Sequence, residues 1–311
     1  MAVVSSDFLT AVLTNFRALF NRDFQAAMGL QGWRDLVIPI DSAGEIETYE
    51  WFGTVPQVED VTHGQVSLNS LPEYNFSITN KEYQVAIEVS RAALERDRLN
   101  LISPRVSQLA EEHARHPGQL IFNLVVDNAT AYDGSAYFAN TRTIGNGANI
   151  DNILTGSGTS ISQIQTDLAA ARAQMRLFQD DQGRPMNLIG NAIMVPPGLE
   201  FTMWQALNRN SGDNVNTPAM PVTDGGIFSA SGYTVITIPY LTDANDWYLW
   251  HIGGPMRRPF ILQTEKRPVL ESDTDPNTRE SILKRNFLYS SYGRYNVGFT
   301  DPRFGVKTTN T

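Results

Sequence analysis

The chain has 311 residues, 41% of them hydrophobic, so it is long enough to bury a substantial core. It contains no cysteine, which excludes disulfides, thiolate metal sites and cysteine nucleophiles. The net charge is −9 and the pI about 5.0, whereas a groove-binding nucleic-acid protein is expected to be basic. Charged residues make up only 18% of the chain, below the usual quarter, so we expect partners to cover part of the surface.

The N-terminal sequence MAVVSSDFLTAVLTNF has neither a basic segment nor an A-x-A cleavage site, so it does not read as a secretory signal. No apolar run approaches the length of roughly 20 residues that a membrane helix needs. We therefore expect no membrane partner and synthesis in the cytoplasm.

The first half of the chain begins with a helix and continues with strands. Apolar residues at three- and four-residue spacing predict a helix over residues 5–26. Residues 33–40 are expected to be extended, and four short runs within 44–90 have strand character. In the last run apolar and polar residues alternate, as in a half-buried strand. The alternating apolar residues are Tyr83, Val85, Ile87 and Val89.

The second half of the chain mixes helices and strands. A long helix is predicted over residues 103–130, broken near Pro117 or divided into two helices in series. Residues 131–159 are expected to form a loop, and 160–178 a helix capped by Ser160. A helix opened by Pro196-Pro197 follows a strand at 192–195. Further strands are expected at 233–240, 246–251 and 259–266, with a final strand pair at 284–299. Without a βαβα rhythm or a repeat, the fold class is α+β.

Charge is distributed unevenly along the chain. Residues 41–80 carry seven acidic residues and no lysine or arginine, whereas residues 251–311 carry six acidic and ten basic residues. A charge run is most often a solvated face. Complementarity between copies of the chain, with the acidic segment of one against basic surface of the next, is the sharper alternative.

The chain offers no recognisable catalytic or metal-binding motif. His113 and His116 are three residues apart on a predicted helix, a spacing that can place two metal ligands on one face, but no third ligand follows. The glycine-rich stretches at 144–158 and 223–227 lack the lysine and serine or threonine of a phosphate-binding loop. We expect neither an enzyme nor a cofactor.

Six segments, spread in order over nearly the whole chain, carry a resemblance to a known family. They are TYEWFGTVPQVEDV (48–61), ITNKEYQVAIEVSRAALERD (78–97), YDGSAYFANTR (132–142), MVPPGLE (194–200), WYLWHIGGPMRRPFILQ (247–263) and FLYSSYGRYNVGF (287–299). In these segments and their order the chain resembles the major head subunits of Mu-like tailed phages. It departs from the family at Phe138-Ala139-Asn140 and at Arg96-Asp97-Arg98, neither of which touches a catalytic role.

The resemblance implies the tailed-phage and herpesvirus major capsid fold. That fold has an N-terminal arm, an extended two-stranded loop, a peripheral domain with a spine helix (about 103–130), and an axial domain. Its parts map onto this sequence as the arm at 1–40, the extended loop at 41–82, the peripheral domain at 83–184, the axial domain at 185–255 and the return to the peripheral domain at 256–311.

The resemblance also implies a function. A major capsid protein forms hexamers and pentamers that close an icosahedral shell around double-stranded DNA, and it resides in the virion. The implied partners are further copies of the chain, a scaffolding protein, a portal, in some cases a decoration protein, and packaged DNA bound without sequence specificity. Two other classes stay open: a tail or decoration protein of a phage, and an α+β hydrolase with an unrecognised site.

The acidic segment then becomes a strap between subunits, with its aromatic residues uncovered in the monomer: Tyr49, Trp51, Phe52, Tyr74 and Phe76. The residues expected in intersubunit contacts are Glu45, Glu47, Glu50, Trp51, Phe52, Glu59 and Asp60 on the strap, and Arg257, Arg258, Lys284 and Arg285 on the surface it meets.

Some relatives in this fold join subunits through lysine–asparagine isopeptide bonds. The four lysines here are Lys81, Lys266, Lys284 and Lys307, and only Lys81 touches the strap, at its base. We expect non-covalent assembly. Because no scaffold-like helical leader precedes the arm, we also expect a separate scaffolding protein and no large N-terminal removal.

Overall fold

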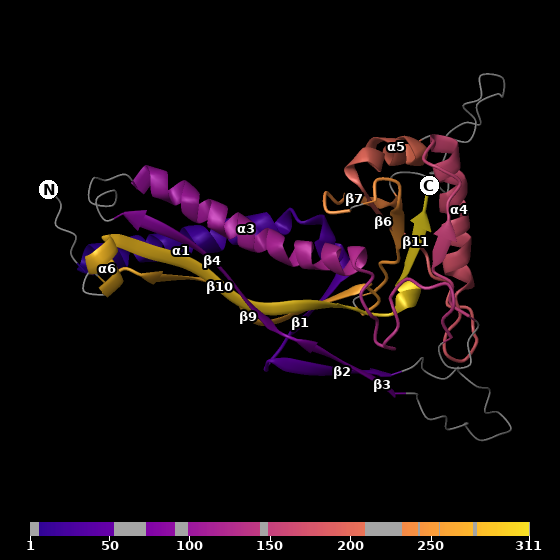
Figure 1. Ribbon diagram of the computed structural model, residues 1–311, viewed down its shortest axis with the longest axis horizontal. Helices are drawn as coiled ribbons and strands as arrows, with labels where there is room; N and C mark the ends of the chain where they lie inside the picture. The colour runs from indigo at the N-terminus through magenta and orange to yellow at the C-terminus, as the bar shows by residue number, and fades with distance from the viewer. Residues whose placement is uncertain are drawn as a thin grey trace.

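The computed structural model describes residues 6–52, 73–90, 99–143, 149–208, 232–241, 243–254, 256–275 and 279–310. Its elongated half is a four-stranded sheet in the order β1-β9-β10-β4, covered on one face by two long helices (Figure 1). The strands are β1 (Val37–Asp41), β4 (Lys81–Ser90), β9 (Phe260–Asp273) and β10 (Asn286–Phe299), and the helices are α1 (Ser6–Gly29) and α3 (Leu99–Val126).

The other half is a five-stranded sheet in the order β5-β11-β8-β6-β7, flanked by α4 and α5 (Figure 1). Its strands are β5 (Ile153–Thr155), β6 (Ala192–Val195), β7 (Thr234–Thr237), β8 (Trp247–Trp250) and β11 (Gly305–Thr309). The helices are α4 (Ile161–Leu177) and α5 (Pro197–Asn208). The predicted cap is confirmed, because Ser160 precedes α4 and its backbone N–H donates to the Gln163 side chain (3.1 Å).

A two-stranded antiparallel ribbon of β2 (Ile46–Phe52) and β3 (Glu73–Thr79) forms a separate small sheet below the four-stranded one (Figure 1). It connects β1 to β4, which occupy opposite edges of the four-stranded sheet. The ribbon therefore crosses beneath the β9–β10 hairpin, on the side away from α1 and α3 (Figure 1).

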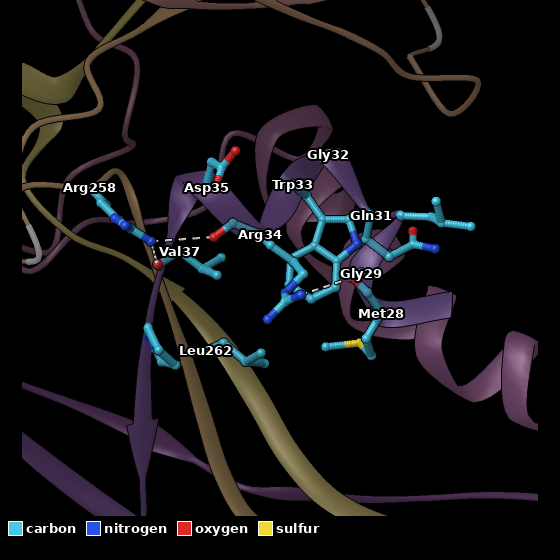
Figure 2. A pocket seen from close by; sticks show the side chains of 12 residues that line it. Met28, Gly29, Gln31, Gly32, Trp33, Arg34, Asp35, Val37, Arg258 and Leu262 are labelled. Atoms are coloured by element: carbon cyan, nitrogen blue, oxygen red, sulfur yellow. Dashed lines mark hydrogen bonds between the residues drawn. The ribbon is translucent and has the colours of Figure 1, made fainter. Parts of the chain in front are cut away.

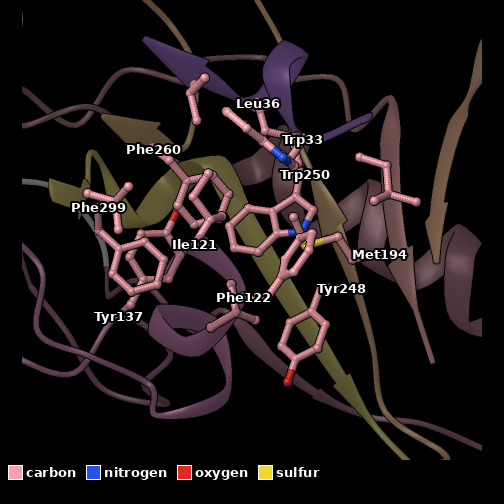
Figure 3. Close-up of a cluster of buried hydrophobic side chains, with 14 of the residues drawn as sticks. Trp33, Leu36, Ile121, Phe122, Tyr137, Met194, Tyr248, Trp250, Phe260 and Phe299 are labelled. Atoms are coloured by element: carbon pink, nitrogen blue, oxygen red, sulfur yellow. The ribbon is translucent and has the colours of Figure 1, made fainter. Parts of the chain in front are cut away.

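An aromatic cluster joins the two sheets, and we call it the central core (Figure 3). Trp250 of β8 is fully buried, and its ring lies 4.9 Å from Phe260 of β9 and 5.8 Å from Tyr137. Tyr137 stacks on Phe299 of β10 at 3.9 Å and donates its hydroxyl hydrogen to the Asp301 carbonyl. Because rings from both sheets interlock, burial of large aromatic surface fixes how the halves meet.

Two further cores stabilise the ends of the molecule. The α1–α3 core packs Phe16 and Phe20 of α1 against Val106 and Leu109 of α3 and Tyr289 of β10. The α4–α5 core buries the inner sides of those two helices against the five-stranded sheet. Its fully buried side chains include Ile164, Leu168, Met175, Met203 and Leu249.

Helix α3 is one continuous helix of 28 residues, although Pro104 and Pro117 lie inside it. The predicted break near Pro117 is therefore wrong. A proline removes one helical hydrogen bond and opposes helix. Here each half of α3 is bound to its own core, the first half to the α1–α3 core and the second, from Ile121, to the central core.

Three other sequence expectations need correction. Residues 33–36 are not extended; they belong to the 3-10 helix η1 (Gly32–Leu36), which buries Trp33 and Leu36, three residues apart, on one side. The final strand pair at 284–299 is a single long strand, β10. The short helix α6 (Arg279–Lys284) and the strand β11 were not predicted, and β5 lies within the predicted loop 131–159. Among the described helices, none combines the length and apolar character required to cross a bilayer.

Candidate intersubunit surface

The base of the ribbon is fixed by a small polar network. The Glu47 carboxylate accepts hydrogen bonds from the backbone N–H of Ala43 (2.9 Å) and the hydroxyl of Ser42 (3.0 Å). The Asn80 amide donates to Ser42 Oγ (3.1 Å) and to the carbonyl of Gly44 (2.8 Å). The hydrogen bonds from Ala43 and Ser42 lower the pKa of Glu47. Both ends of the ribbon are thereby held in one place.

The ribbon is also bound to the underside of the β9–β10 hairpin. Tyr49 donates its hydroxyl hydrogen to Gln263 Oε1 (2.7 Å), and Gln263 Nε2 donates to the carbonyl of Ile78 (3.2 Å). Ile78 in turn lies directly against Gly298, where an added Cβ would come within 2.6 Å of its Cδ1. Glycine at 298 is therefore what allows the ribbon to approach β10 this closely.

Two aromatic residues of the ribbon, Tyr49 and Phe76, are not uncovered as predicted. Tyr49 stacks on Phe76, with ring centroids 5.2 Å apart, and both side chains are half-buried. Phe76 also packs against the α4–α5 core. Their own chain covers these two rings, so the expectation of exposure is wrong for them. The side chains of Trp51, Phe52 and Tyr74 lie outside the described residues.

The described acidic side chains of the strap differ in their surroundings. Glu45 is exposed, and its neighbour Ile46 is a large apolar side chain that is 58% exposed. The Glu47 carboxylate is already hydrogen-bonded to Ser42 and Ala43 of its own chain. The side chain of Glu50 and the whole of residues Glu59 and Asp60 lie outside what the structure describes. Ile46 is the contact candidate that the sequence reasoning missed.

Much of the basic C-terminal segment is paired within the chain. Among the described residues, at least five of its ten basic side chains form intrachain ion pairs: Lys266–Glu271, Arg267–Asp41, Arg294–Glu265, Arg303–Asp301 and Lys307–Asp246. The excess of positive charge read from the sequence is therefore only partly available to a partner.

The four basic residues predicted to meet the strap fall into two places. Arg258 donates through Nη1 to the carbonyl of Val37 (2.8 Å), so it supports the start of β1. Arg257 is exposed beside it. Lys284 and Arg285 are exposed at the end of the β9–β10 hairpin, next to Ile282 and Leu283, which are 62% and 71% exposed. This hairpin end, residues 282–285, lies at the opposite end of the sheet from the β2–β3 ribbon (Figure 1).

A shallow open groove runs beside Trp33, between the end of α1, η1 and β1 (Figure 2). Its volume is about 490 Å³, and its walls include Met28, Leu30 and Leu262. Leu30 is 86% exposed at its rim. Arg34 and Arg258 border the groove. Arg34 donates a hydrogen bond to the carbonyl of Met28, and Arg258 donates one to the carbonyl of Val37.

The histidine pair considered as a metal site faces the protein interior. His113 is 3% exposed and His116 is half-buried. The Nδ1 atom of each histidine lies within hydrogen-bond distance of a hydroxyl on β10, so the two rings do not point towards a shared metal position. Across the described parts of the chain, no three histidine, aspartate or glutamate side chains converge in a way that could hold a metal ion.

Comparison with known sequences identifies relatives of one kind. A family model described as phage capsid protein matches residues 75–308. The chain is 25% identical over 301 residues to the Mu-like prophage FluMu major head subunit of Haemophilus influenzae, covering 96% of this chain and 72% of that one. It is 26% identical over 166 residues to the major capsid protein of Escherichia phage Mu, covering 52% of each chain. The resemblance to Mu-like head subunits is thus confirmed.

Solved structures agree on the fold. The procapsid subunit of bacteriophage JBD30 superposes with a TM-score of 0.58 at 17% identity, over 99% of this chain and 77% of that one. The mature capsid subunit of bacteriophage PhiM1 superposes with a TM-score of 0.56 at 12% identity, over 90% and 86% of the two chains. The chain belongs to the phage capsid protein family and has the fold of tailed-phage capsid subunits.

Proposed function

We propose that this chain is the major capsid protein of a tailed-phage head, which assembles into hexamers and pentamers of an icosahedral shell around double-stranded DNA. The observation that carries the proposal is the family match over residues 75–308, on a subunit whose ribbon forms a separate two-stranded sheet. A subunit of this shape can bury more surface against neighbours than a compact one, and homo-oligomers with closed symmetry are the usual outcome.

The domain limits inferred from the sequence are proposed here with one change. The sequence assigns residues 1–40 to the arm, 41–82 to the extended loop, 83–184 to the peripheral domain, 185–255 to the axial domain and 256–311 to the return. Because the five-stranded sheet takes in β5 and β11 and is covered by α4, we extend the axial domain to include those three elements.

The ribbon acts as the strap between neighbouring subunits. Glu45 and Ile46 are the contact candidates among its described exposed residues, which also include Thr48, Asn75, Ser77 and Thr79. The sequence adds Glu50, Trp51, Phe52, Glu59 and Asp60. The partner surface is Arg257 on one side and the hairpin end with Lys284 and Arg285 on the other. Glu47 and Arg258 serve mainly their own subunit, because each is bound to backbone groups within it. The hairpin end and the ribbon lie at opposite ends of the four-stranded sheet, so they would meet between copies.

Other partners follow from the same role. A scaffolding protein, a portal and possible decoration proteins complete the head, and the assembled protein resides in the virion after synthesis in the host cytoplasm. With a net charge of −9, the subunit holds DNA without sequence-specific contacts and leaves the packaged genome mobile. Cryo-electron microscopy showing DNA bound to an ordered basic lining would contradict this part.

Assembly itself is tested by expressing the chain together with the scaffolding protein of its phage. We expect closed shells or hexamers by negative-stain microscopy and by sedimentation velocity. Material that stays monomeric at all concentrations, with and without the scaffold, would overturn the proposal. The joints are expected to be non-covalent, so boiling in detergent should yield single-chain bands; a ladder of heavier bands would contradict that.

Charge reversal tests the strap. Glu45→Lys and Arg285→Glu should each lower the shell yield several-fold, and the double variant should recover part of it if the two residues face each other between copies. Glu111→Lys, the same charge change at an exposed position of α3 remote from the ribbon, is the control and should assemble normally. If the Glu45 and Arg285 variants also assemble normally, the electrostatic account fails while the shell function stands.

A further inference from the structure

The middle of α3 contacts the four-stranded sheet through polar and aromatic groups, unlike its two ends. Towards the N-terminus, Val106 and Leu109 belong to the α1–α3 core, and towards the C-terminus, Ile121 and Phe122 belong to the central core. Between them, two histidines face the sheet, directly before Pro117. A proline leaves the carbonyl four residues earlier, here that of His113, without its helical N–H partner.

Each histidine makes one hydrogen bond to β10 through Nδ1. His113 Nδ1 lies 2.7 Å from the hydroxyl of Ser291, and His116 Nδ1 lies 2.9 Å from the hydroxyl of Tyr295. The His116 ring also packs 4.3 Å from the ring of Tyr83 on β4. Nε2 of His113 is buried without a hydrogen-bond partner. A proton added there would bring a charge into a site with no acceptor for it.

Space for the His113 ring depends on the strand beneath it. An added Cβ at Gly293 would lie 3.3 Å from His113 Nε2, and the pairing of β10 with β9 shifts register at this point. The contact is therefore close-packed, and it has little room to admit water or a counter-ion beside a charged imidazole.

The charged groups around the pair do not favour a second positive charge. On α3, burial lowers the pKa of His116 and Glu112 only partly opposes this, because Glu112 is exposed and also contacts Arg115 at 3.4 Å. On the α3-facing side of the sheet, β4 contributes Lys81, opposite Tyr295 in the register, and Tyr83.

From the other elements, Arg17 of α1 donates to the carbonyl of Leu270, the β9 partner of Ser291. β10 contributes Tyr289 and Tyr295, whose pKa values burial raises above the ordinary value, so both stay neutral. β9 presents Pro268 and Leu270 here. In the described structure around His113, no carboxylate reaches its ring.

We propose that the contact of α3 with β10 at His113 and His116 is an acid-sensitive joint, intact while both imidazoles are neutral and released when they take up protons. The joint lies within one subunit, so it does not depend on which partners the subunit binds. Acid would loosen the middle of the spine helix from the sheet while the apolar cores at its ends stay formed.

The direction of the effect follows from proton linkage. Burial lowers the pKa of His113 to about 4 and also lowers the pKa of His116, relative to the ordinary value near 6.5. The released state therefore binds protons more readily than the closed state. Closing is fully favoured above pH 6.5, and each histidine shifts the opening equilibrium by up to about tenfold per pH unit as the pH falls below 6.5 towards its lowered pKa.

The experiment is hydrogen exchange of the purified subunit between pH 7.5 and 5.0, a range in which histidines change charge before most carboxylates do. After correction for intrinsic exchange, amides of residues 110–122 should lose protection steeply below pH 6.5, while those of α4 keep theirs. In the variant His113→Asn/His116→Asn, the protection of α3 should become independent of pH. Asparagine can place its amide near the position of Nδ1, so it can keep each hydrogen bond but cannot take up a proton.

Two further variants make the result decisive. His251 is half-buried and also bonds through Nδ1, to the carbonyl of Ile189 (2.7 Å), but it lies at the five-stranded sheet. His251→Asn should therefore retain the wild-type pH response of α3. If the double variant does not fold, the half-buried His116→Asn alone should reduce the steepness of the response. Wild-type protection that does not change with pH, or a response that survives in the asparagine variants, would overturn the proposal.

Discussion

The hydroxyl of Tyr49, on the ribbon, donates to the side-chain oxygen of Gln263, a fully buried residue of β9. Gln263 uses its amide nitrogen on the carbonyl of Ile78, so one buried side chain binds both strands of the ribbon. The position of the ribbon relative to the sheet is therefore set by a specific polar contact as well as by apolar packing.

Tyr49→Phe should destabilise the subunit by about 1–3 kcal/mol, because it leaves the buried oxygen of Gln263 without a donor. Urea unfolding measures the loss, and hydrogen exchange should show faster opening of β2 than of β4. Tyr240→Phe is the matched control. That ring stacks on Phe122 at 6.2 Å and Tyr240 is 39% exposed, so the change should stay within about 0.5 kcal/mol of wild type. Equal effects of the two substitutions would contradict the anchoring role of Tyr49.

Gly298→Ala should push the ribbon away from β10, because the new methyl group would lie 2.6 Å from Ile78 Cδ1. We expect a loss of about 1–3 kcal/mol in the free energy of unfolding. Adding Ile78→Val, which removes that methyl group, should restore part of the loss, as a double-mutant cycle would measure. Gly44→Ala, where an added Cβ meets nothing within 4 Å, serves as control. A strictly additive cycle would show that the two residues do not press on each other.

Asp301→Asn should be among the most damaging single changes in the chain. Asp301 and Arg303 are 2% and 3% exposed, and Arg303 Nε lies 2.8 and 2.9 Å from the two carboxylate oxygens. Breaking a buried pair leaves an uncompensated charge, which costs about 3–5 kcal/mol. The exposed pair of Arg267 and Asp41, 3.5 Å apart, should lose less than about 1 kcal/mol on Arg267→Ala. Thermal unfolding of both variants would check the contrast.

Arg257→Ala and Arg258→Ala should separate assembly from stability. Arg258 donates to the carbonyl of Val37, so its loss should lower the free energy of unfolding by about 1–2 kcal/mol, discounted for its partial exposure. Arg257 is exposed, so its loss should leave unfolding within about 0.5 kcal/mol of wild type while reducing shell formation. Unfolding and sedimentation measured on the same preparations test both. Normal assembly of Arg257→Ala would remove it from the partner surface.

Local sequence patterns predicted the regular elements whose burial is one-sided. The helices α1 and α4 and the strand β4 each bury one face, so the spacing of their apolar residues was enough to predict them. Residues 33–36 were predicted wrongly because a segment of four residues is too short for its apolar spacing to distinguish a strand from a 3-10 helix. The continuity of α3 through Pro117 depends on two cores formed by distant segments, which no local window contains.

The candidate surface was predicted less completely than the fold. The acidic character of the ribbon is visible in the sequence, but the bonding of Glu47 to Ser42 and Ala43 is not, because it requires the turn that brings them together. Likewise, the partners of Lys307 and Arg267 lie far away in the chain, at Asp246 and Asp41. A segmental charge count therefore overstated how much basic surface a neighbour could meet.

The two attachments of the ribbon have a mechanical consequence. Tyr49 is bound to the four-stranded sheet through Gln263, whereas its stacking partner Phe76 packs against the α4–α5 core. If one half of the subunit rotates against the other, these adjacent rings cannot both follow. The Tyr49–Phe76 stack must then slide, or either Tyr49 or Phe76 must lose its contact with its own half. The direction of the ribbon therefore depends on the angle between the two halves. Binding of the ribbon by a neighbouring subunit would therefore be coupled to the angle between the two halves, and it would oppose a change in that angle.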